Sequence, residues 1–415
     1  DTAMDWIIEN KNKANIISVA NLGDIVENGN NEEQWNNALL FNKLPSAGIN
    51  LLMQPGNHDW PEYFDKYFGG DSEYGKLTKD YVVRTSPSGR SSYMVNDGGS
   101  YKYMTLSIDY HSFDTDLSWV EEVLSNTNIP TIVTSHDLQN CSDTAPSDIK
   151  LSEKGKEVWN VVKKYNQVFM MIGGHSHGSG DEILINDFGN EVFNVLADYQ
   201  FAYNGGNALF KFAEFDENTN KIYLSTFSPY AATLSEDERT FFDVNYLTGD
   251  GNYSELNINF TERFAGMEKS DLINKSLEEL KSLVEKAESL NKDKYTYESF
   301  NALEEVVYKA KAILIDKNIN YNIVLDTVKT LQNAIDNLKI IEDKPSNDEE
   351  SNKPGGSQEN NKPNGSQDNS FGNNSNNNLP KTGDSSSVLY TLLSLLAALG
   401  GVIKYGKRRD NIRVN

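Results

Sequence analysis

The sequence predicts an α/β domain followed by three helices, a flexible stalk and an apolar segment near the C-terminal end. Three observations support this order. Apolar strands alternate with amphipathic stretches over residues 1–265, apolar stripes with helical spacing follow, and a polar region precedes the last apolar run. Because 415 residues exceed what one hydrophobic core usually serves, we expect two or three folded units.

The composition restricts the class of partner. The chain has 38 Lys and Arg against 61 Asp and Glu, a formal net charge of −23. Nucleic acids bind to basic grooves, so we expect no nucleic-acid partner. A small phosphorylated substrate remains compatible, because bound cations would invert the local field. The single cysteine, Cys141, cannot form an internal disulfide, and we interpret it as a structural or incidental thiol.

Four predicted strands of the first region each end at a polar motif. The strands cover residues 15–20, 49–53, 129–134 and 168–172, with a helix at 33–44. The motifs that follow them are Gly23-Asp24, Gly56-Asn57-His58-Asp59, His136 and Gly173-Gly174-His175-Ser176-His177. Open α/β sheets bind ligands at the carboxyl ends of their strands. Imidazole, carboxylate and amide groups are metal ligands, so the pattern predicts a metal site and metal-assisted hydrolysis.

The order Gly-Asp, Gly-Asn-His-Asp, His and Gly-His-x-His resembles the calcineurin-like metallophosphoesterases, over about residues 1–265. Residues 196–200, 205–207 and 225–230 are similar to the closing strands of a secreted bacterial branch. The resemblance implies two mixed sheets that form a sandwich flanked by helices. It also implies that phosphomonoester or phosphodiester bonds are hydrolysed by a hydroxide bridging two divalent ions of Mn, Fe, Zn or Mg.

The resemblance also implies the metal ligands. Asp24 matches the carboxylate that bridges the two ions, and His177 matches a ligand of the first ion. The second ion would be completed by Asn57, His136 and His175. Glycines around the two last histidines permit the backbone to bend there.

Two further residues of the second motif are expected to serve catalysis. In the resembling family the residue that matches His58 donates a proton to the leaving oxygen or stabilises charge on phosphate. We expect Asp59 to hold the other ring nitrogen of His58 and to raise its pKa. His111 has no counterpart in these motifs, and its alternatives are a place in the substrate pocket or a surface or structural role.

One motif of the family is missing. An Asp-x-His or Asp-x-Gln pattern should precede Gly23 by a few tens of residues, but residues 1–14 read as a helix with Ile7 and Ile8 inward. We therefore expect the phosphoesterase domain to be truncated before Asp1, with ligands of the first metal lost and the set for the second kept.

Three apolar stripes at residues 273–287, 300–314 and 324–338 predict helices that pack as an antiparallel bundle over residues 269–341. Residues 295–300 and 331–338 resemble FIVAR modules, the small helical modules appended to secreted bacterial proteins. Such a module could contact glycans or serve as a spacer. The next residues, 342–378, hold almost no apolar side chains and are expected to form a disordered stalk.

The final segment, residues 379–415, resembles a sortase sorting signal of Gram-positive surface proteins. Its parts are Leu379, Pro380, Lys381, Thr382 and Gly383, an apolar transmembrane segment at 385–403 and a basic tail. The resemblance implies cleavage between Thr382 and Gly383 and attachment to peptidoglycan. The sequence thus predicts a wall-anchored phosphoesterase acting on a phosphorylated small molecule or a cell-surface substrate. The rival interpretation is a surface adhesin or glycan-binding protein with an inactive hydrolase domain.

Overall fold

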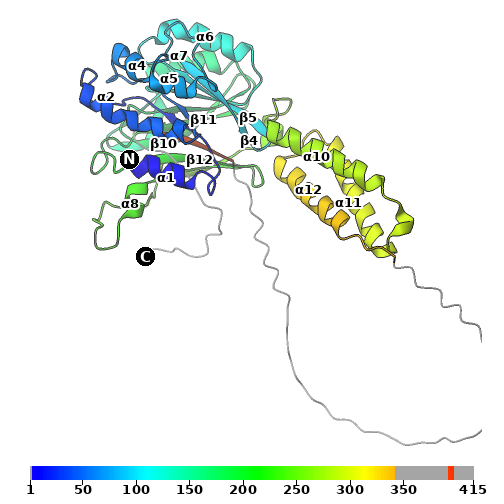
Figure 1. Cartoon of the computed structure of the whole chain (residues 1–415). Helices are drawn as coiled ribbons and strands as arrows, with labels where there is room; N and C mark the ends of the chain where they lie inside the picture. Colours follow the sequence, from blue (N-terminus) through cyan, green and yellow to red (C-terminus); the bar gives the residue numbers. More distant parts are fainter. Residues whose placement is uncertain (1, 342–390, 397–415) are drawn as a thin grey trace, which may run out of the picture.

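The computed structural model describes residues 2–341 and 391–396, and two seven-stranded sheets form its centre (Figure 1). The first sheet has the order β14 (Tyr246–Leu247), β13 (Lys221–Phe227), β12 (Phe210–Asp216), β16 (Thr391–Leu396), β1 (Ile16–Asn21) and β2 (Asn50–Leu52), with β15 (Tyr253–Asn257) also on β13. The second has the order β10 (Ser179–Ile185), β11 (Glu191–Ala197), β9 (Val168–Gly173), β6 (Thr131–Ser135), β5 (Tyr101–Ile108), β4 (Ser92–Gly98) and β3 (Val82–Val83). A hairpin of β7 (Gln139–Ser142) and β8 (Ala145–Leu151) forms a third, small sheet.

Both large sheets are mixed. In the second sheet, neighbouring strands are parallel from β5 through β6 and β9 to β11. In the first sheet, β1 runs parallel to β2. The outer strands β4 and β10 are antiparallel to their neighbours. The four strands that the sequence predicted are present as β1, β2, β6 and β9, so the predicted α/β class is confirmed. Their carboxyl ends carry the polar motifs.

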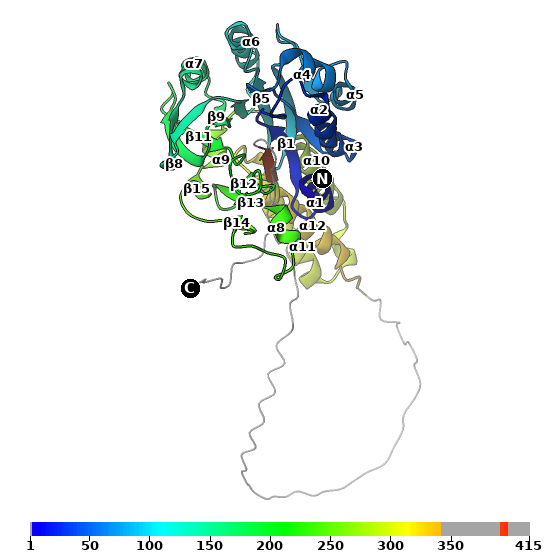
Figure 2. The same ribbon diagram turned by 90° about the vertical axis from the view of Figure 1, so that its left-hand side faces the viewer.

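The two sheets face each other across an apolar core that includes Leu22, Tyr103, Phe169 and Phe215. A second core lies between the first sheet and helices α1 (Thr2–Asn10), α2 (Glu32–Ala38), α3 (Lys43–Ser46), α4 (Pro61–Phe68) and α5 (Glu73–Thr78). A third core lies between the second sheet and helices α6 (Phe113–Ser125) and α7 (Glu153–Val162). Figure 2 shows α2, α3 and α5 on the side of β1, and α7 on the side of β9 and β11.

Short helices connect the remaining parts: the 3₁₀ turn at Leu39–Asn42, α8 (Pro229–Thr233) and α9 (Phe260–Arg263). The predicted helix at 33–44 is therefore split into α2, the 3₁₀ turn and α3. Pro45 stands inside α3 and has no N–H to donate, which is consistent with a broken helix at this point. The predicted helix at residues 1–14 is α1, and Ile7 is fully buried beneath it.

Strand β16 lies between β1 and β12, parallel to the former and antiparallel to the latter. It falls inside the segment 385–403, for which a membrane span was expected, and it is a strand rather than a helix. The flanking edges of β1 and β12 both offer backbone N–H and C=O groups, which an extended segment can satisfy. The rest of that segment lies outside the described residues, and none of the helices within the described part is long and apolar enough to cross a membrane.

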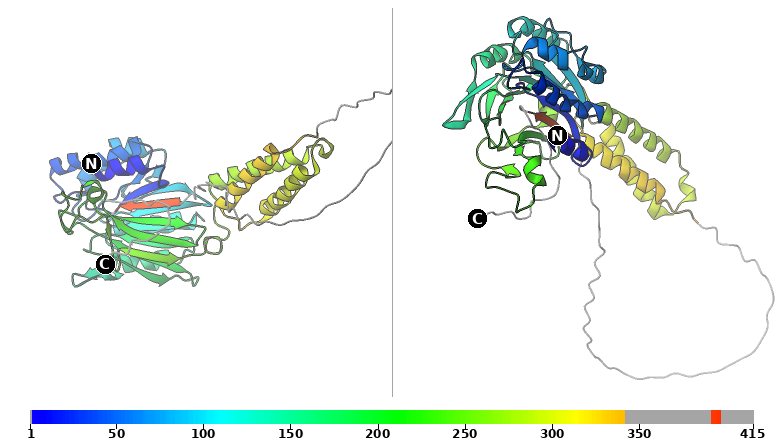
Figure 3. Two further views of the ribbon diagram at one scale, coloured as in Figure 1. Left: turned by 90° about the horizontal axis from the view of Figure 1, so that it is seen from below. Right: turned by 60° about the vertical axis from the view of Figure 1, so that its left-hand side comes forward.

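Three longer helices follow the α/β domain: α10 (Asp271–Glu288), α11 (Tyr297–Ile315) and α12 (Tyr321–Asp336), with a 3₁₀ turn at Lys292–Lys294. They share one apolar core that includes Ile273, Leu280, Leu303, Val324 and Leu331. These residues belong to the three stripes found in the sequence, and Figure 3 shows the helices projecting from one end of the sheets. Residues 342–378, expected to be a stalk, lie outside the described residues.

The helices are joined to the turn between β4 and β5. The Tyr321 N–H donates to Ser100 Oγ at 2.7 Å, and Ser270 Oγ donates to the Gly99 carbonyl. Glu217, itself buried, accepts the Ser100 N–H at 2.9 Å. Because β5 starts at this turn and ends at Ile108, the helices attach to the end of the sheet opposite to the polar motifs.

Candidate metal centre

The structure brings four of the predicted ligands together at the carboxyl ends of β1, β2, β6 and β9. Ligand atoms of Asp24, His136 and His175 all lie within 4.8 Å of one another. Asn57 Oδ1 lies 2.9 Å from His136 Nε2. Since the four residues come from two different sheets, only the packing of the sandwich places them side by side.

His136 is the centre of this group. Its Nδ1 lies 2.8 Å from the Leu22 carbonyl, which can only accept, so Nδ1 carries hydrogen. Its Nε2 faces Asn57 Oδ1, His175 Nδ1 at 3.2 Å and Asp24 Oδ2 at 3.3 Å. These neighbours are acceptors or can act as acceptors, so a cation at their centre would satisfy them together. The donor set therefore fits a divalent metal ion.

The pKa shifts of Asp24 and His175 agree with this fit, whereas the shift of His136 reflects its contact with the Asp24 carboxylate. Burial alone would lower the pKa of His136, but the hydrogen bond and charge of Asp24 outweigh it and raise this pKa. Burial would raise the pKa of Asp24, but His136 outweighs that effect and lowers it. Burial, followed by the charge of His136, lowers the pKa of His175. An ionised carboxylate and a neutral imidazole are the forms that ligate metals.

The backbone at the ligands has unusual geometry. Asp24 and His175 have φ of +51° and +69°, a region that non-glycine residues seldom adopt, and Gly23 has φ of +92°. A Cβ atom on Gly56 would lie 2.2 Å from Asp24 Oδ1. One on Gly23 would lie 2.7 Å from His136 Nδ1. The glycines of both motifs are therefore needed for the turns to approach each other.

Asp59 does not contact the His58 ring, contrary to expectation. Its carboxylate is fully buried and accepts the backbone N–H groups of Gly56 at 2.8 Å, Ile25 at 3.0 Å and Val26 at 3.1 Å. The reason is the turn geometry, which aims three N–H groups at this carboxylate. Burial raises the pKa of Asp59 to about 6, although these three donors oppose the shift.

The His58 ring contacts a different backbone group. Its Nδ1 lies 2.7 Å from the Glu27 carbonyl, so Nδ1 carries hydrogen and Nε2 is the nitrogen left for a transferable proton. The hydrogen bond to Glu27 is the largest cause of a raised His58 pKa, and the charge of Asp59 adds to it. About a third of the His58 side chain, 37%, is exposed to solvent, so a substrate could reach it.

The structure does not bring His177 into the group. This side chain is exposed, and its ring lies against Phe201 with 3.6 Å between the ring centroids. The contact covers apolar ring surface on both sides. The Cys141 thiol, half-buried, lies 3.6 Å from the His177 carbonyl and is not part of the group. Leu379, Pro380, Lys381, Thr382 and Gly383, expected to be the sortase signal, lie outside the described residues.

For His111 the sequence left open a place in the substrate pocket or a surface or structural role, and it assigned no role to Asp109 or Tyr110. The Tyr110 ring lies 5.6 Å from the His136 ring and 6.4 Å from the His175 ring, measured between centroids. His111 contacts the backbone of the second motif. The segment directly follows β5, a neighbour of β6, so the rule that drew attention to the other strand ends would also have found it.

Comparisons with known proteins find two family models and a similar bacterial protein. Residues 1–179 match the family model of the calcineurin-like phosphoesterases, and residues 373–412 match the LPXTG cell wall anchor motif. The chain is similar to the uncharacterized protein YvnB of Bacillus subtilis (strain 168), with 28% identity over 275 residues. That match covers 62% of this chain and 20% of YvnB, so the chain spans about a fifth of that protein's length.

A structural comparison finds a dimetal phosphatase from Danio rerio. The identity is 14% and the TM-score 0.37, with 61% of this chain and 89% of that chain covered. Residues 1–179 are thus similar to the calcineurin-like phosphoesterases. Its LPXTG motif is that of surface proteins anchored to the Gram-positive cell wall, and it implies sortase processing and attachment to peptidoglycan.

Replacing Asp59 with Asn should destabilise the α/β domain. The amide oxygen can replace part of the carboxylate, but the NH₂ group would face a buried N–H donor, which costs about 1–3 kcal/mol. Urea denaturation of Asp59→Asn should therefore show a lower midpoint than the unmodified chain. Asp5→Asn is the control, because Asp5 is about half exposed and forms a surface ion pair with Lys43. Equal midpoints for Asp59→Asn and Asp5→Asn would contradict the role assigned to Asp59.

Proposed function

We propose that the calcineurin-like phosphoesterase domain of this wall-anchored protein is a metal-dependent enzyme that hydrolyses phosphomonoester or phosphodiester bonds at the bacterial surface. The observation that carries the proposal is the convergence of Asp24, Asn57, His136 and His175, with the Nε2 of His136 directed to the other three ligands. The substrate would be a phosphorylated small molecule or a phosphoester of the cell surface.

In this proposal Asp24 would be a ligand of both of two ions of Mn, Fe, Zn or Mg, and Asn57, His136 and His175 would hold the second ion. His177 would serve the first ion after its exposed ring turns away from Phe201. When bound, the divalent ions supply Lewis acidity, which stabilises charge on phosphate and makes water a stronger nucleophile near neutral pH. Backbone contacts orient Asp24 and His136 before any ion arrives, which lowers the cost of binding.

His58 would act on the substrate rather than on a metal. Its Nδ1–H is held by the Glu27 carbonyl, so the ring is oriented and Nε2 is the atom that can give a proton to the leaving oxygen. The raised pKa of His58 keeps more of the ring protonated near neutral pH. Asp59 would support His58 indirectly, by holding the turn in which both residues stand.

The other parts of the chain would place this domain outside the cell. We propose a FIVAR-like helical module over residues 269–341, a stalk over 342–378 and a sorting signal over 379–415 with a membrane-inserted apolar segment before cleavage. The helices attach at the start of β5, whereas the candidate centre lies beyond its end. Eight residues of strand span roughly 25 Å, so the wall-attached side and the site face different directions.

An adhesin with an inactive hydrolase domain remains the rival. Residues 1–14 hold no Asp-x-His or Asp-x-Gln motif, so we expect little turnover by the 415-residue chain itself. In a version that carries this motif upstream, we expect hydrolysis of p-nitrophenyl phosphate or bis(p-nitrophenyl) phosphate that needs added Mn²⁺, Zn²⁺, Fe²⁺ or Mg²⁺ and stops with a chelator. Absence of metal-dependent turnover with both esters and a wider phosphoester panel would reject the proposal. Binding of the same chain to purified wall glycans would then favour the adhesin.

The ligand set should be detectable without any activity. His136→Ala removes the residue that contacts each of the other three ligands, so the affinity for Mn²⁺ should fall by more than about 10-fold. Isothermal titration with Mn²⁺ measures this. Exposed Asp148 offers a control, because Asp148→Asn removes a surface carboxylate that is not one of these ligands. Unchanged affinity in His136→Ala would show that the ion binds elsewhere.

His58→Ala should separate catalysis from metal binding. Loss of a positioned proton donor lowers turnover by about 10²-fold or more, while metal content should stay close to that of the unmodified chain. Turnover and metal analysis of the same preparation provide both numbers. Loss of a whole metal equivalent would make His58 a ligand and would end its assignment as a proton donor.

Thr382→Ala should block anchoring, because the sorting reaction is expected to join Thr382 to the wall. The variant should appear in the medium or the membrane fraction of a Gram-positive host. Lys381→Ala is the matched control, since this residue is the variable X of the LPXTG motif. Covalent attachment of Thr382→Ala to purified wall would refute the expected cleavage position.

A further inference from the structure

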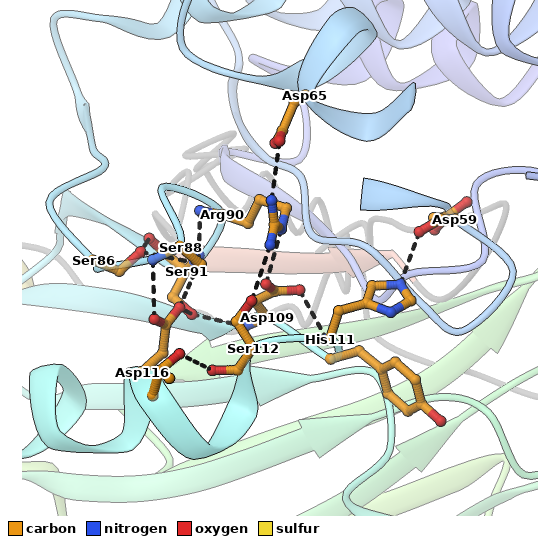
Figure 4. A network of polar contacts seen from close by, with 12 residues as sticks. Asp59, Asp65, Ser86, Ser88, Arg90, Ser91, Asp109, His111, Ser112 and Asp116 are labelled. Carbon is orange, nitrogen blue, oxygen red and sulfur yellow. Dashed lines mark hydrogen bonds and ion pairs between the residues drawn. The ribbon is translucent and has the colours of Figure 1, made fainter. Parts of the chain in front are cut away.

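His111 makes an unusual contact with the turn that carries Asn57 and His58. Its Nε2 lies 2.9 Å from the Gly56 carbonyl. The same Nε2 lies 2.8 Å from the Asp59 carbonyl, and Figure 4 shows this second contact. Both partners can only accept, so Nε2 carries a hydrogen that the two carbonyls share. Gly56 and Asp59 are the first and last residues of the motif, and one imidazole therefore ties both ends of the turn together.

The turn has little backbone bonding of its own. The Asp59 N–H reaches the Gly56 carbonyl at 3.3 Å, beyond the usual range for an N–H···O bond. Two of its other N–H groups donate to carboxylates: Gly56 N–H to Asp59, and His58 N–H to Asp24 at 3.0 Å. His111 supplies the contact on the carbonyl side. Removing the His111 ring would leave the Gly56 carbonyl with only the long contact from the Asp59 N–H. The Asp59 carbonyl would lose the donor that His111 gives it.

A buried ion pair fixes the position of His111. The His111 N–H donates to Asp109 Oδ1 at 3.0 Å, and Asp109 is fully buried. Arg90 donates to Asp109 Oδ2 through Nε at 2.9 Å, and also to Asp65 at 3.0 Å and to Ser112 Oγ at 2.9 Å. Burial would lower the pKa of Arg90, but Asp109 and Asp65 outweigh it, so the guanidinium stays charged. A fully buried carboxylate needs such a partner.

The neighbouring residue touches the centre directly. Tyr110 packs the edge of its ring on His136, with the planes inclined by 81°, and lies near His175. The Lys154 Nζ donates to the Tyr110 carbonyl at 2.8 Å and lies 3.6 Å from the centroid of its ring. The short segment 109–111 thus contacts the ligands from β6 and β9 through Tyr110, and the turn after β2 through His111.

We propose that His111 is a positioning residue of the metal centre: its Nε2–H holds the 56–59 turn so that Asn57 faces His136. The buried Asp109–Arg90 pair holds His111 in turn. His111 contacts no ligand atom of the group and acts through the backbone of Gly56 and Asp59. The inference deepens the proposed function and rests on it for the effect on catalysis, whereas the effect on metal binding can be measured without it.

Two variants test this in the full chain with Mn²⁺ as the probe. His111→Phe keeps a ring but removes the donor, and the dissociation constant for Mn²⁺ should rise about 10- to 100-fold, as for lost outer contacts of other metal sites. His111→Gln places an amide NH₂ at a similar reach and should stay within about threefold of the unmodified chain. Wild-type affinity in the Phe variant, or equal losses in Phe and Gln variants, would overturn the proposal.

Activity on bis(p-nitrophenyl) phosphate at saturating Mn²⁺ provides a second readout. A displaced turn also misplaces His58, so kcat of the Phe variant should fall about 10-fold or more, with a change in KM below about threefold. A change confined to KM would contradict a positioning role. If the unmodified chain binds Mn²⁺ but hydrolyses no ester, this second readout is lost and the Mn²⁺ affinities alone decide the role of His111.

A third measurement uses the unmodified protein, so it does not depend on whether a variant folds. In protein labelled with ¹⁵N-histidine, His111 should show the Nε2–H form, with this hydrogen protected from exchange by the two carbonyls. The spectrum is recorded at a pH where the ring is neutral. A neutral His111 with hydrogen on Nδ1 would show that Nε2 does not bridge Gly56 and Asp59, and the proposal would be wrong.

Discussion

The candidate metal centre depends on the close approach of two backbone turns, one after β1 and one after β2. Neither Gly23 nor Gly56 has room for a Cβ atom, because the other turn or His136 occupies that space. Two carboxylates then bind the turns to each other. Asp24 accepts the His58 N–H, and Asp59 accepts N–H groups from Ile25 and Val26 of the first turn. Asp24 and Asn57 therefore belong to one rigid unit rather than to separate loops.

The residues of the centre fall into three groups: the ligands, the groups that orient the ligands, and a buried ion pair farther out. The innermost layer is formed by Asp24, Asn57, His136 and His175. Around it, single contacts from the backbone or a side chain set orientation: the Leu22 carbonyl fixes the hydrogen of His136 on Nδ1. The outermost layer is the buried charge of Asp109 and Arg90. Such support is important because acceptors that face one another repel until a cation arrives.

The arrangement of the chain separates attachment from chemistry. The helical group α10 to α12 is joined through Ser100 and Ser270 to the turn that begins β5. The polar motifs lie at the opposite ends of the parallel strands, so the length of β5 and its neighbours separates the helices from the candidate centre. A protein anchored beyond its helices would thereby present the candidate centre away from the wall. Cations bound at the candidate centre would offset part of the strongly acidic charge of the chain in its surroundings.

The local sequence determined the main strands and helices of this protein and the types of its candidate ligands. The apolar strands, their polar ends and the helical stripes follow from side-chain periodicity, and β1, β2, β6, β9 and the three long helices are where this periodicity places them. The ligand types also followed, since Asp24, Asn57, His136 and His175 are all close to a strand end. A short motif after a strand predicts a ligand because parallel strands share one edge.

Only the tertiary structure decided which groups touch. Asp59 and His58 are adjacent in sequence, yet the turn aims the carboxylate at three N–H groups and leaves the His58 ring to the Glu27 carbonyl. His111 lies 52 residues from Asp59 and has no motif of its own, yet it bridges the ends of the second turn. His177 is two residues from His175 but is exposed beside Phe201. Contacts such as these depend on backbone direction and on the packing of one sheet against another, and neither is recorded in the local pattern of residues.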